Sequence, residues 1–400
     1  MQIILGITGG IAAYKAAEVA RLLVNQGHRV RCILTEAGAR FITPLTLTSL
    51  TGEPCYGANP DQGEWRAKPV IEHIELARWA DLVAVAPATA DILGKAANGL
   101  ANDLLSTVLL ATRAPVLWVP AMNTGMWEHP AVQANVARLR AFGHTIVDPG
   151  EGALACGEEG AGKLAEVGAI VEAILMLGTP KQRSLSGRRV LITAGPTRED
   201  LDPVRTLTNR STGTMGIELA RAFRDVGARV QLVLGGDGSA PWGVETIRVR
   251  SAQEMLEACL ARWVDSDGLV AAAAVADQRP ECLSAEKVKK VDGPETLVLV
   301  RTPDILAQLA ATRRSAQWVL GFAAESEHHL EHAVAKLKNK GLDAVLVNDV
   351  QGGGGFGAQA NTLTPLTTQG AHPPLGPLPK DQLARAVVQW WAQQLESGPA

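Results

Sequence analysis

Short apolar runs alternate with amphipathic stretches along the first half of the chain. The apolar runs are rich in Val, Ile and Leu and have the lengths of strands, at residues 2–7, 29–34, 82–86 and 116–119. Between them, apolar residues recur at helical spacing at about 12–25 and 102–112. Buried strands separated by helices predict a parallel sheet with helices on both faces, which is an α/β fold. Ligands in such sheets lie at the carboxyl ends of the strands, so the loops there are where a site is expected.

The same pattern begins again near residue 190. Strands are expected near 190–193, 230–234, 269–273, 297–300, 318–321 and 344–347, and helices at about 215–226, 253–263, 303–311 and 329–339. Residues 179–187, between the two halves, are polar and contain Pro and Gly, which predicts a linker. We therefore expect two Rossmann-like three-layer domains with mostly parallel sheets, at residues 1–178 and 188–400.

The end of the chain has a different pattern. Residues 352–357 are rich in glycine and predict a mobile loop, and the proline-rich residues 371–379 predict an extended spacer. Residues 381–394 predict an amphipathic helix whose Trp390 and Trp391 pack on its own domain or on a partner subunit.

The composition agrees with two folded domains and gives no indication of nucleic acid or a membrane as a partner. The 400 residues suit two domains of about 150 to 200 residues. The net charge of −3 and the isoelectric point near 6.3 give no reason to expect nucleic acid or an anionic membrane as a partner. The five cysteines form no CxxC pair, which favours a reducing cytoplasm. The first residues lack a basic leader and no apolar run is long enough to span a bilayer, so we expect a cytoplasmic protein.

Two loops of the first half could bind a ligand. Gly9 and Gly10 follow the first strand and offer bare backbone to a phosphate, although a tight turn also needs glycine. Met122 and Asn123 follow the strand at 116–119, where they either face a ligand or begin a helix and fill the core.

Two further residues of the first half are candidates for catalysis. Cys156 lies in the glycine-rich segment GEGALACG, an unusual place for a buried, inert thiol. His73, in IEHIE, is by itself more typical of a surface histidine than of a base.

Taken together, these stretches resemble one family. GITGGIAAYK, the HI dipeptide at 73–74, WADLVAVAPATAD, AANGLANDLLS, PAMNTGMW and GALACG occur in the order and spacing of the flavin-dependent cysteine decarboxylases. Specifically, the first half resembles phosphopantothenoylcysteine decarboxylase and is expected to share its flavodoxin-like fold and its FMN. The resemblance implies that His73 orients the substrate and assists proton removal, that Asn123 binds the departing carboxylate, and that Cys156 is a proton donor on a flap.

The same resemblance implies the flavin contacts. They are expected at Gly9, Gly10, Thr35, Thr89, Ser106 and Met122. In this family FMN oxidises the substrate thiol, which creates the electron sink that decarboxylation needs.

The second half has its own polar clusters. Asn209 precedes Ser-Thr-Gly at a helix start, which can cap the helix or bind a phosphate. Lys336 and Lys340 share a helical face, where a polyphosphate would offset their repulsion, although solvated surface lysines remain the simpler interpretation. The small residues Ala271, Ala272 and Ala273 lead to Asp277, which permits either close approach of a nucleotide or tight packing of a helix on the sheet.

As a set, the second-half motifs resemble phosphopantothenate cysteine ligase. The matching stretches are TAGPTREDLDPVRTLTNRSTGTMG, AAVAD, SAEKVKK, TPDIL, GFAAE and KGLDAVLVNDV. With the first half, the chain from residue 1 to about 364 is similar to the bacterial bifunctional enzymes of coenzyme A biosynthesis. The sequence departs from the ligase pattern at Thr302, where Asn is common, and at Ser284-Ala285, where Ala-Pro is common. These changes concern the local geometry of two loops, since neither alters a charged group.

The ligase resemblance implies roles for individual residues. The substrates are phosphopantothenate, cysteine and CTP, with Mg²⁺ bridging the triphosphate and an acyl cytidylate as intermediate. Asn209 is expected to stabilise that intermediate. The nucleotide is expected at Ala271, Ala272, Ala273, Asp277, Lys287, Pro303, Asp304, Ile305, Leu306 and Phe322, and its phosphates at Lys336 and Lys340. The preference for CTP over ATP rests on the resemblance.

Two other interpretations stay open at this point. A two-domain NAD(P)- or flavin-linked reductase would also contain two nucleotide-type folds, but neither half has GxGxxG. A noncatalytic flavoprotein subunit would not need His73, Asn123 and Cys156 together. The family resemblance further implies trimers of the flavin domain with FMN between subunits, dimers of the ligase domain, and hence a dodecamer.

Overall fold

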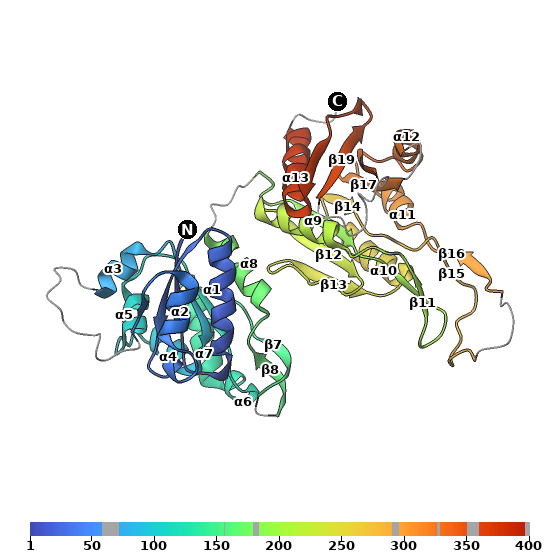
Figure 1. Cartoon of the computed structure of the whole chain (residues 1–400). Coiled ribbons are helices and arrows are strands. Elements are labelled where there is room, and N and C mark those ends of the chain that lie inside the picture. The colour runs from blue at the N-terminus through green and yellow to red at the C-terminus, as the bar shows by residue number, and fades with distance from the viewer. Residues whose placement is uncertain are drawn as a thin grey trace. The chain divides into compact units, whose positions relative to one another are not determined.

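The chain divides into two compact units, Met1–Pro180 and Lys181–Ala400 (Figure 1). The computed structural model describes residues 1–57, 72–155, 157–178, 184–289, 296–325, 329–349 and 360–396. Cys156 and the whole glycine-rich segment at 352–357 are therefore outside the described residues. In the part of the chain that is described, no helix has both the length and the apolar character needed to cross a bilayer.

The first unit is a three-layer α/β structure. A six-stranded sheet has the order β3-β2-β1-β4-β5-β6, and all its neighbouring strands are parallel. Its elements are β1 (Gln2–Ile7), η1 (Ile11–Tyr14), α1 (Lys15–Asn25), β2 (Arg29–Leu34), η2 (Gly38–Arg40), α2 (Pro44–Thr51), β3 (Cys55–Tyr56), α3 (Glu72–Trp79), β4 (Leu82–Ala88), α4 (Ala90–Ala97), α5 (Leu104–Ala111), β5 (Val116–Pro120), α6 (Thr124–Trp127), α7 (Pro130–Ala141), β6 (Thr145–Ile146), β7 (Gly150–Ala153), β8 (Glu159–Lys163) and α8 (Val167–Gly178).

Helices cover both faces of this sheet. One core lies between the sheet and helices α3, α4, α5 and α7, whereas α1 and α8 pack together and against the sheet strands. Every residue of β4 and β5 is buried, which is why the sequence shows continuous apolar runs rather than alternation. The prediction of a parallel α/β domain is confirmed. Because strand order reverses between β1 and β4, the crevice at their carboxyl ends is the expected place for a ligand.

The second unit repeats this plan with a larger sheet. Its order is β13-β12-β9-β14-β17-β18-β19, with β20 and β21 both paired to β19. Strands β13 to β18 of this sheet run parallel, and β19 is antiparallel to β18. The elements are β9 (Arg189–Ala194), β10 (Arg198–Asp200), β11 (Thr206–Thr208), α9 (Thr214–Asp225), β12 (Arg229–Gly235), β13 (Glu245–Val249), α10 (Ala252–Trp263), β14 (Gly268–Ala271), β15 (Gln278–Pro280), β16 (Leu299–Arg301), α11 (Ile305–Ala311), β17 (Trp318–Glu325), α12 (His329–Asn339), β18 (Ala344–Asp349), β19 (Ala360–Thr367), β20 (Gly370–Ala371), β21 (Leu375–Pro379) and α13 (Lys380–Glu396).

Two cores flank this second sheet. Helices α9 and α13 cover one face, and α10, α11 and α12 cover the other. Trp391 of α13 is buried and lies 5.3 Å from the ring of Trp318 on β17, so the terminal helix packs on its own unit, as predicted.

Two sequence predictions differ from the structure. The apolar run at 297–300 forms β16 two residues later, in a two-stranded antiparallel ribbon with β15 outside the main sheet, and Leu297 and Val298 are exposed. The proline-rich stretch at 371–379 is not a spacer, because β20 and β21 pair with β19. Proline is tolerated there because an edge strand leaves one row of its N–H groups unpaired.

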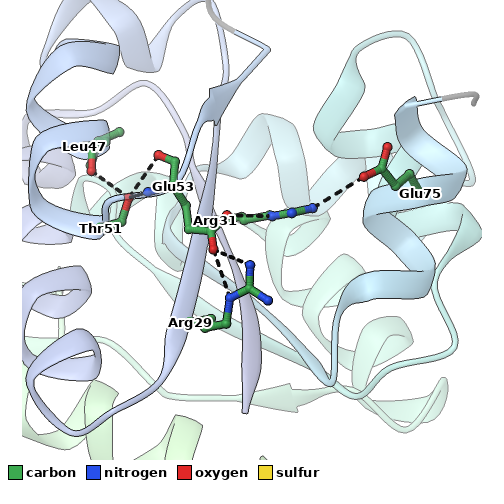
Figure 2. A network of polar contacts seen from close by, with 6 residues as sticks. All are labelled: Arg29, Arg31, Leu47, Thr51, Glu53 and Glu75. Atoms are coloured by element: carbon green, nitrogen blue, oxygen red, sulfur yellow. Dashed lines mark hydrogen bonds and ion pairs between the residues drawn. The ribbon is translucent and has the colours of Figure 1, made fainter. Parts of the chain in front are cut away.

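A cluster of charged side chains holds α3 and the turn after α2 against β2 (Figure 2). Arg29 donates to Glu53 through Nε at 2.9 Å, and Arg31 donates to the same carboxylate through Nε at 3.1 Å. The Arg31 guanidinium lies 3.7 Å from Glu75 and 4.3 Å above the ring of Trp79, both on α3. Burial opposes ionisation of Glu53, but the hydrogen bonds from the two arginines hold its pKa below the usual range. One cluster thus fixes the helix that carries His73.

We expect Glu53→Gln to lower the free energy of unfolding of the first unit by about 1 kcal/mol at pH 7, because it removes a charged acceptor shared by two arginines. Since the folded pKa of Glu53 lies below its ordinary value of 4.5, the stabilisation is complete above that pH and is lost as the pH falls through the folded pKa. Calorimetric unfolding of the full chain at pH 7 and pH 3 measures both effects.

The matched control is Glu36→Gln, since Glu36 is 88% exposed and lies 3.7 Å from an exposed Arg40. It is expected to change stability by less than about 0.5 kcal/mol. Equal effects of the two substitutions would contradict a special contribution from the Glu53 cluster.

Candidate functional site

The candidate flavin residues lie in loops at one edge of the first sheet. Gly9 and Gly10 follow β1, Thr35 follows β2, Thr89 follows β4, and Met122 with Asn123 follows β5. These four strands are neighbours in the order β2-β1-β4-β5, so their carboxyl ends form one continuous edge. The edge is therefore the candidate site of this unit.

The loops after β1 and β4 are joined by buried hydrogen bonds. Thr8 is buried and donates its hydroxyl to the carbonyl of Pro87 at 2.7 Å, and the N–H of Thr89 donates to Thr8 Oγ1 at 3.1 Å. Thr89 begins α4 without a side-chain cap. A Cβ added to Gly10 would lie 3.9 Å from Thr89. Gly10 and the uncapped start of α4 are thus adjacent, and such a helix start attracts an anion.

Two of the other candidates make local contacts that explain the residue type without a ligand. A Cβ on Gly9 would lie 2.4 Å from Cβ of Ala37, so close packing itself requires glycine there. The hydroxyl of Thr35 donates to the Ile7 carbonyl at 3.3 Å and accepts from the N–H of Gly38 at 3.1 Å. Flavin contact by these residues stays a prediction.

Ser106, another candidate flavin contact, has a structural role at the start of α5. It is buried and forms a capping box at the start of α5. Its hydroxyl accepts from the N–H of Asp103 at 3.1 Å and donates to the Asp103 carbonyl at 3.0 Å, and its N–H donates to the Asp103 carboxylate at 2.7 Å. The Ser106 hydroxyl therefore has both a donor and an acceptor in this helix start.

The hairpin of β7 and β8 is anchored on the loop that contains Asn123. The Met122 N–H donates to the Gly162 carbonyl at 3.0 Å, and a Cβ on Gly162 would lie 2.3 Å from the Met122 carbonyl. The Asn123 amide N–H₂ donates to Glu158, and its Oδ1 accepts from the N–H of Gly125 at 2.8 Å. The hairpin whose connection contains position 156 is thus held beside Asn123. Cys156 itself lies outside the described residues.

His73 comes from a different part of the unit. It is the second residue of α3, a helix that packs against α5 and that the Arg31 cluster fixes on β2. Its side chain is half-buried. The structure of the single chain thus places Asn123 at the edge formed by the strand ends and His73 on a helix.

The second unit has a cavity of about 720 Å³ at the carboxyl ends of its parallel strands. It is lined by all the residues predicted to hold the nucleotide except Lys287, together with Asn209: 209, 271–273, 277, 303–306, 322, 336 and 340. These residues come from segments far apart in the sequence. They lie in the loop before α9, at the end of β14 and in the loop after it, at the start of α11, on β17, and on α12 and directly after it.

Glycines bring the start of α9 to the mouth of this cavity. Gly195 has a φ of +80° and follows β9, and a Cβ there would lie 1.9 Å from the Gly235 carbonyl. Gly213 has a φ of +74°, and its Cβ would lie 2.8 Å from Cα of Gly195. Side chains at these two positions would push the loop away from the sheet. The amide of Asn209 donates to the carbonyls of Ala274 and Val275, each at 3.1 Å, which holds this loop at the end of β14.

Two lysines, Lys336 on α12 and Lys340 directly after this helix, line the cavity and form polar contacts within the protein. Lys336 Nζ donates to the Phe322 carbonyl at 2.6 Å, and Lys340 Nζ lies 2.8 Å from the carboxylate of Asp304. Asp304 also caps α11 by accepting from the N–H of Ala307 at 3.0 Å. Burial opposes ionisation of Asp304, but Lys340 and the cap hold its pKa below the usual range. The carboxylate therefore stays charged and pairs with Lys340.

Lys287 lies elsewhere, on a segment that we call the arm, formed by residues 198–208, 278–289 and 296–301. Lys287 is exposed, and the N–H of its neighbour Val288 donates to Asp202 at 3.2 Å. The Asp202 carboxylate is buried and also accepts from Arg205 and from the N–H of Val204. Burial opposes its ionisation, but these donors hold the pKa of Asp202 well below the usual range. In this chain the structure does not bring Lys287 to the cavity.

Sequence reasoning missed several residues that line the cavity. Arg301, Asn348, Asn361 and Lys380 are among them. Asn348 lies within a recognised stretch but shows no distinctive pattern. Asn361 follows the segment predicted as a loop and Lys380 follows the predicted spacer, and neither has a motif of its own. The pairing of β19 with β18 and of β21 with β19 brings them to the cavity.

Comparisons with known proteins agree in both units. Residues 1–178 match the family described as Flavoprotein, and residues 185–395 match the family described as DNA/pantothenate metabolism flavoprotein C-terminal domain. The chain is 43% identical over 398 residues to the coenzyme A biosynthesis bifunctional protein CoaBC of Vibrio cholerae, covering 98% of both chains. It is 45% identical over 367 residues to the protein of that name from Bacillus subtilis, covering 91% of this chain and 89% of the other.

Among solved structures, the C-terminal domain of a coenzyme A biosynthesis bifunctional protein CoaBC is 36% identical and has a TM-score of 0.46. This similarity covers 54% of the present chain and 99% of that domain. The relatives from Vibrio cholerae and Bacillus subtilis match nearly the whole chain at 43% and 45% identity, and each unit matches a family. The chain therefore belongs to the family of coenzyme A biosynthesis bifunctional proteins CoaBC.

Proposed function

We propose that the chain performs two consecutive steps of coenzyme A biosynthesis. The second unit joins phosphopantothenate to cysteine at the expense of CTP, and the first unit decarboxylates the resulting phosphopantothenoylcysteine to phosphopantetheine with FMN. The observation that carries the proposal is the cavity of the second unit, which gathers the nucleotide residues predicted from separate motifs.

The ligation needs an activated carboxylate because a free carboxylate is a poor acyl donor. A carboxylate oxygen of phosphopantothenate attacks the α-phosphorus of CTP, and pyrophosphate leaves. The cysteine amine then attacks the acyl carbon, the bond from that carbon to the phosphate oxygen breaks, CMP leaves, and the amine loses a proton. Asn209, whose amide already faces the end of β14, is suited to stabilise the acyl cytidylate.

The side chains that line the cavity are of types that suit a nucleotide. The alanines at 271–273 and Asp277 line the cavity. The small alanine side chains allow a flat base to approach closely, and the Asp277 carboxylate can accept hydrogen bonds from an amino group or a ribose. Lys336 and Lys340 supply positive charge beside Phe322 and Asp304. A triphosphate would compete with the Phe322 carbonyl and with Asp304 for these lysines.

Mg²⁺ is proposed to accompany the triphosphate. Among the described residues there is no group of three or more His, Cys, Asp or Glu side chains placed to hold a metal. In nucleotide sites Mg²⁺ is commonly held mainly by substrate phosphates and water, with one or two protein carboxylates.

The first unit is proposed to bind FMN at the edge formed by its strand ends. The uncapped start of α4 beside Gly10 fits a phosphate, and Met122 and Thr89 stand on the neighbouring strand ends. FMN, when bound there, would supply the oxidation and the later reduction that decarboxylation of a β-thiol acid needs. Asn123 would bind the substrate carboxylate, His73 would orient the substrate and help to remove a proton, and Cys156 would return one.

Exposed apolar side chains support the proposed oligomer. Four large apolar side chains are exposed on η1, in the turn before α2 and on α2. They are Ile11, Tyr14, Phe41 and Leu45. On the arm, the exposed apolar residues are Val204, Leu283, Val288, Leu297 and Val298. We propose that the first group meets neighbouring subunits in a trimer, with FMN between them, and that the second meets a partner in a dimer, giving a dodecamer.

Cys156→Ser is expected to let carbon dioxide leave but to block the final reduction, because a hydroxyl is a much poorer proton donor than a thiol. The measurement is single-turnover decarboxylation with phosphopantothenoylcysteine, followed by the flavin absorption spectrum and by product analysis. Reduced flavin should accumulate with less than about a hundredth of the normal phosphopantetheine. Cys55→Ser, on β3, is the control and should give normal product. A normal yield from Cys156→Ser would remove this thiol from the mechanism.

Lys287→Gln is expected to abolish ligation and to leave decarboxylation unchanged, since the two activities reside in separate units. CMP release with phosphopantothenate and cysteine measures ligation, and phosphopantetheine formation from supplied phosphopantothenoylcysteine measures decarboxylation. Lys338→Gln, an exposed lysine on α12 that does not line the cavity, is the control. Parallel loss of both activities would mean that Lys287 is structural.

One experiment tests the proposed function as a whole. The purified protein should be yellow, and it should consume CTP only when phosphopantothenate and cysteine are both present. Replacing CTP by ATP, GTP and UTP in turn measures the nucleotide preference. A yellow protein that consumes no nucleotide would indicate a noncatalytic flavoprotein, whereas oxidation of NADPH would indicate a reductase.

A further inference from the structure

The hairpin of β7 and β8 brings a carboxylate of the protein itself to Asn123. Glu158 lies directly before β8, and its carboxylate accepts a hydrogen bond from the amide of Asn123. The proposed function assigns to this same amide the carboxylate that the substrate loses. The chain therefore presents to Asn123 the functional group that the substrate also carries.

Local contacts fix the orientation of the Asn123 amide. Its Oδ1 caps α6 by accepting from the N–H of Gly125 at 2.8 Å and from the N–H of Met126 at 3.4 Å. Because the oxygen is directed at the start of the helix, the N–H₂ group is left for the hairpin. An N–H₂ group only donates hydrogen bonds, so an acceptor such as a carboxylate suits it. Glu158 supplies this acceptor.

The hairpin is held in place by contacts that do not involve the Glu158 side chain. The N–H of Leu154 donates to the Glu158 carbonyl at 2.8 Å, and the N–H of Met122 donates to the Gly162 carbonyl at 3.0 Å. A Cβ on Gly160 would lie 2.7 Å from Oγ1 of Thr124, so β8 packs directly against the loop after β5. The Glu158 side chain can therefore leave Asn123 while the strand stays where it is.

The contact between Glu158 and Asn123 is also easily exchanged. Glu158 is exposed, and within the described part of the chain its carboxylate forms no ion pair. A hydrogen bond open to solvent contributes little, because water can replace either partner. A second carboxylate at the same amide would be repelled by the first. A ligand carboxylate and Glu158 thus exclude each other at Asn123.

We propose that Glu158 occupies the place of the substrate carboxylate at Asn123 and competes with it. The substrate displaces the Glu158 side chain when it binds. The product has lost its carboxylate, so Glu158 returns to Asn123 beside it. Glu158 therefore lowers the affinity for ligands that carry the carboxylate and leaves the affinity for decarboxylated ligands unchanged. This inference rests on the proposed function in so far as Asn123 receives the substrate carboxylate.

A purely structural role of Glu158 makes a different prediction. If its hydrogen bond were needed to hold the hairpin, removing it would weaken the binding of every ligand that the hairpin contacts. Competition at Asn123 predicts a gain of affinity instead, and only for a ligand with a carboxylate. The two interpretations therefore differ in the sign of the effect and in its dependence on the ligand.

The test is calorimetric titration of the full-length, FMN-containing protein with two unreactive analogues. Phosphopantothenoylserine has a hydroxyl in place of the substrate thiol, and its decarboxylated counterpart has a hydrogen in place of the carboxylate. Glu158→Ala should lower the Kd for phosphopantothenoylserine about fivefold, because Asn123 is then free in a larger fraction of molecules. The Kd for the decarboxylated analogue should not change. Glu159→Ala removes the neighbouring exposed charge and should bind both analogues like the parent.

A second background shows whether the effect of Glu158 passes through Asn123. Asn123→Ser keeps an oxygen that can cap α6 but removes the N–H₂ group. In this background, Glu158→Ala should change the Kd for phosphopantothenoylserine by less than about twofold, since the group for which the carboxylates compete is gone. The flavin absorption spectrum and the melting temperature establish that each variant is folded and contains FMN.

Three results would overturn the proposal. They are an unchanged Kd for phosphopantothenoylserine in Glu158→Ala, weaker binding of both analogues by this variant, or an equal gain of affinity for both. Failure of the proposed function is a different outcome, in which the parent protein with FMN binds neither analogue.

Discussion

The carboxyl ends of largely buried parallel strands determine where most of the candidate polar chemistry lies in both units of this protein. Every residue of β4 and β5 is buried, and helices cover both faces of each sheet. Polar side chains therefore reach solvent and ligands mainly at the carboxyl ends of the parallel strands and in the loops that follow them. In the first unit this places Thr89 and Asn123 on neighbouring strand ends, and in the second it places the alanines after β14 beside the start of α9. The candidate sites of both units thus lie at the carboxyl ends of parallel strands.

Several candidate residues at these edges also cap helices, and the two roles are compatible. Asn123 caps α6 through Oδ1 and still has an amide N–H₂ directed at Glu158, and Asp304 caps α11 while pairing with Lys340. A cap fixes the rotamer of the side chain before any ligand arrives, which lowers the entropy cost of binding. Ser106 is different, because its hydroxyl already has both a donor and an acceptor inside the capping box. Its local contacts explain the residue without a ligand.

The sequence was sufficient to predict the layers and most of the cavity wall, because continuous apolar runs and short motifs are local signals. Residues such as Asp304 and Lys340 were found because each lies in a recognisable stretch that starts a helix or follows one. Asn361 and Lys380 were not found, since their place depends on the pairing of β19 with β18 and on proline-rich β21, whose pattern resembles a spacer. The ribbon of β15 and β16 was misplaced for a related reason. Its exposed Leu297 and Val298 carry the apolar signal of a buried strand.

The position of Lys287 bears on how complete the second site is in a single chain. The buried carboxylate of Asp202 joins the turn at 202–205 to Val288, which holds the segment with Lys287 on the arm and away from the cavity. The same arm carries five exposed apolar side chains, and a group of this kind is typical of an interaction surface. They are Val204, Leu283, Val288, Leu297 and Val298. If Lys287 acts on the nucleotide as proposed, the arm has to move or to meet the cavity of a second copy. The exposed apolar residues favour the second copy, because burying them at an interface stabilises the contact that would also bring the lysine to its substrate.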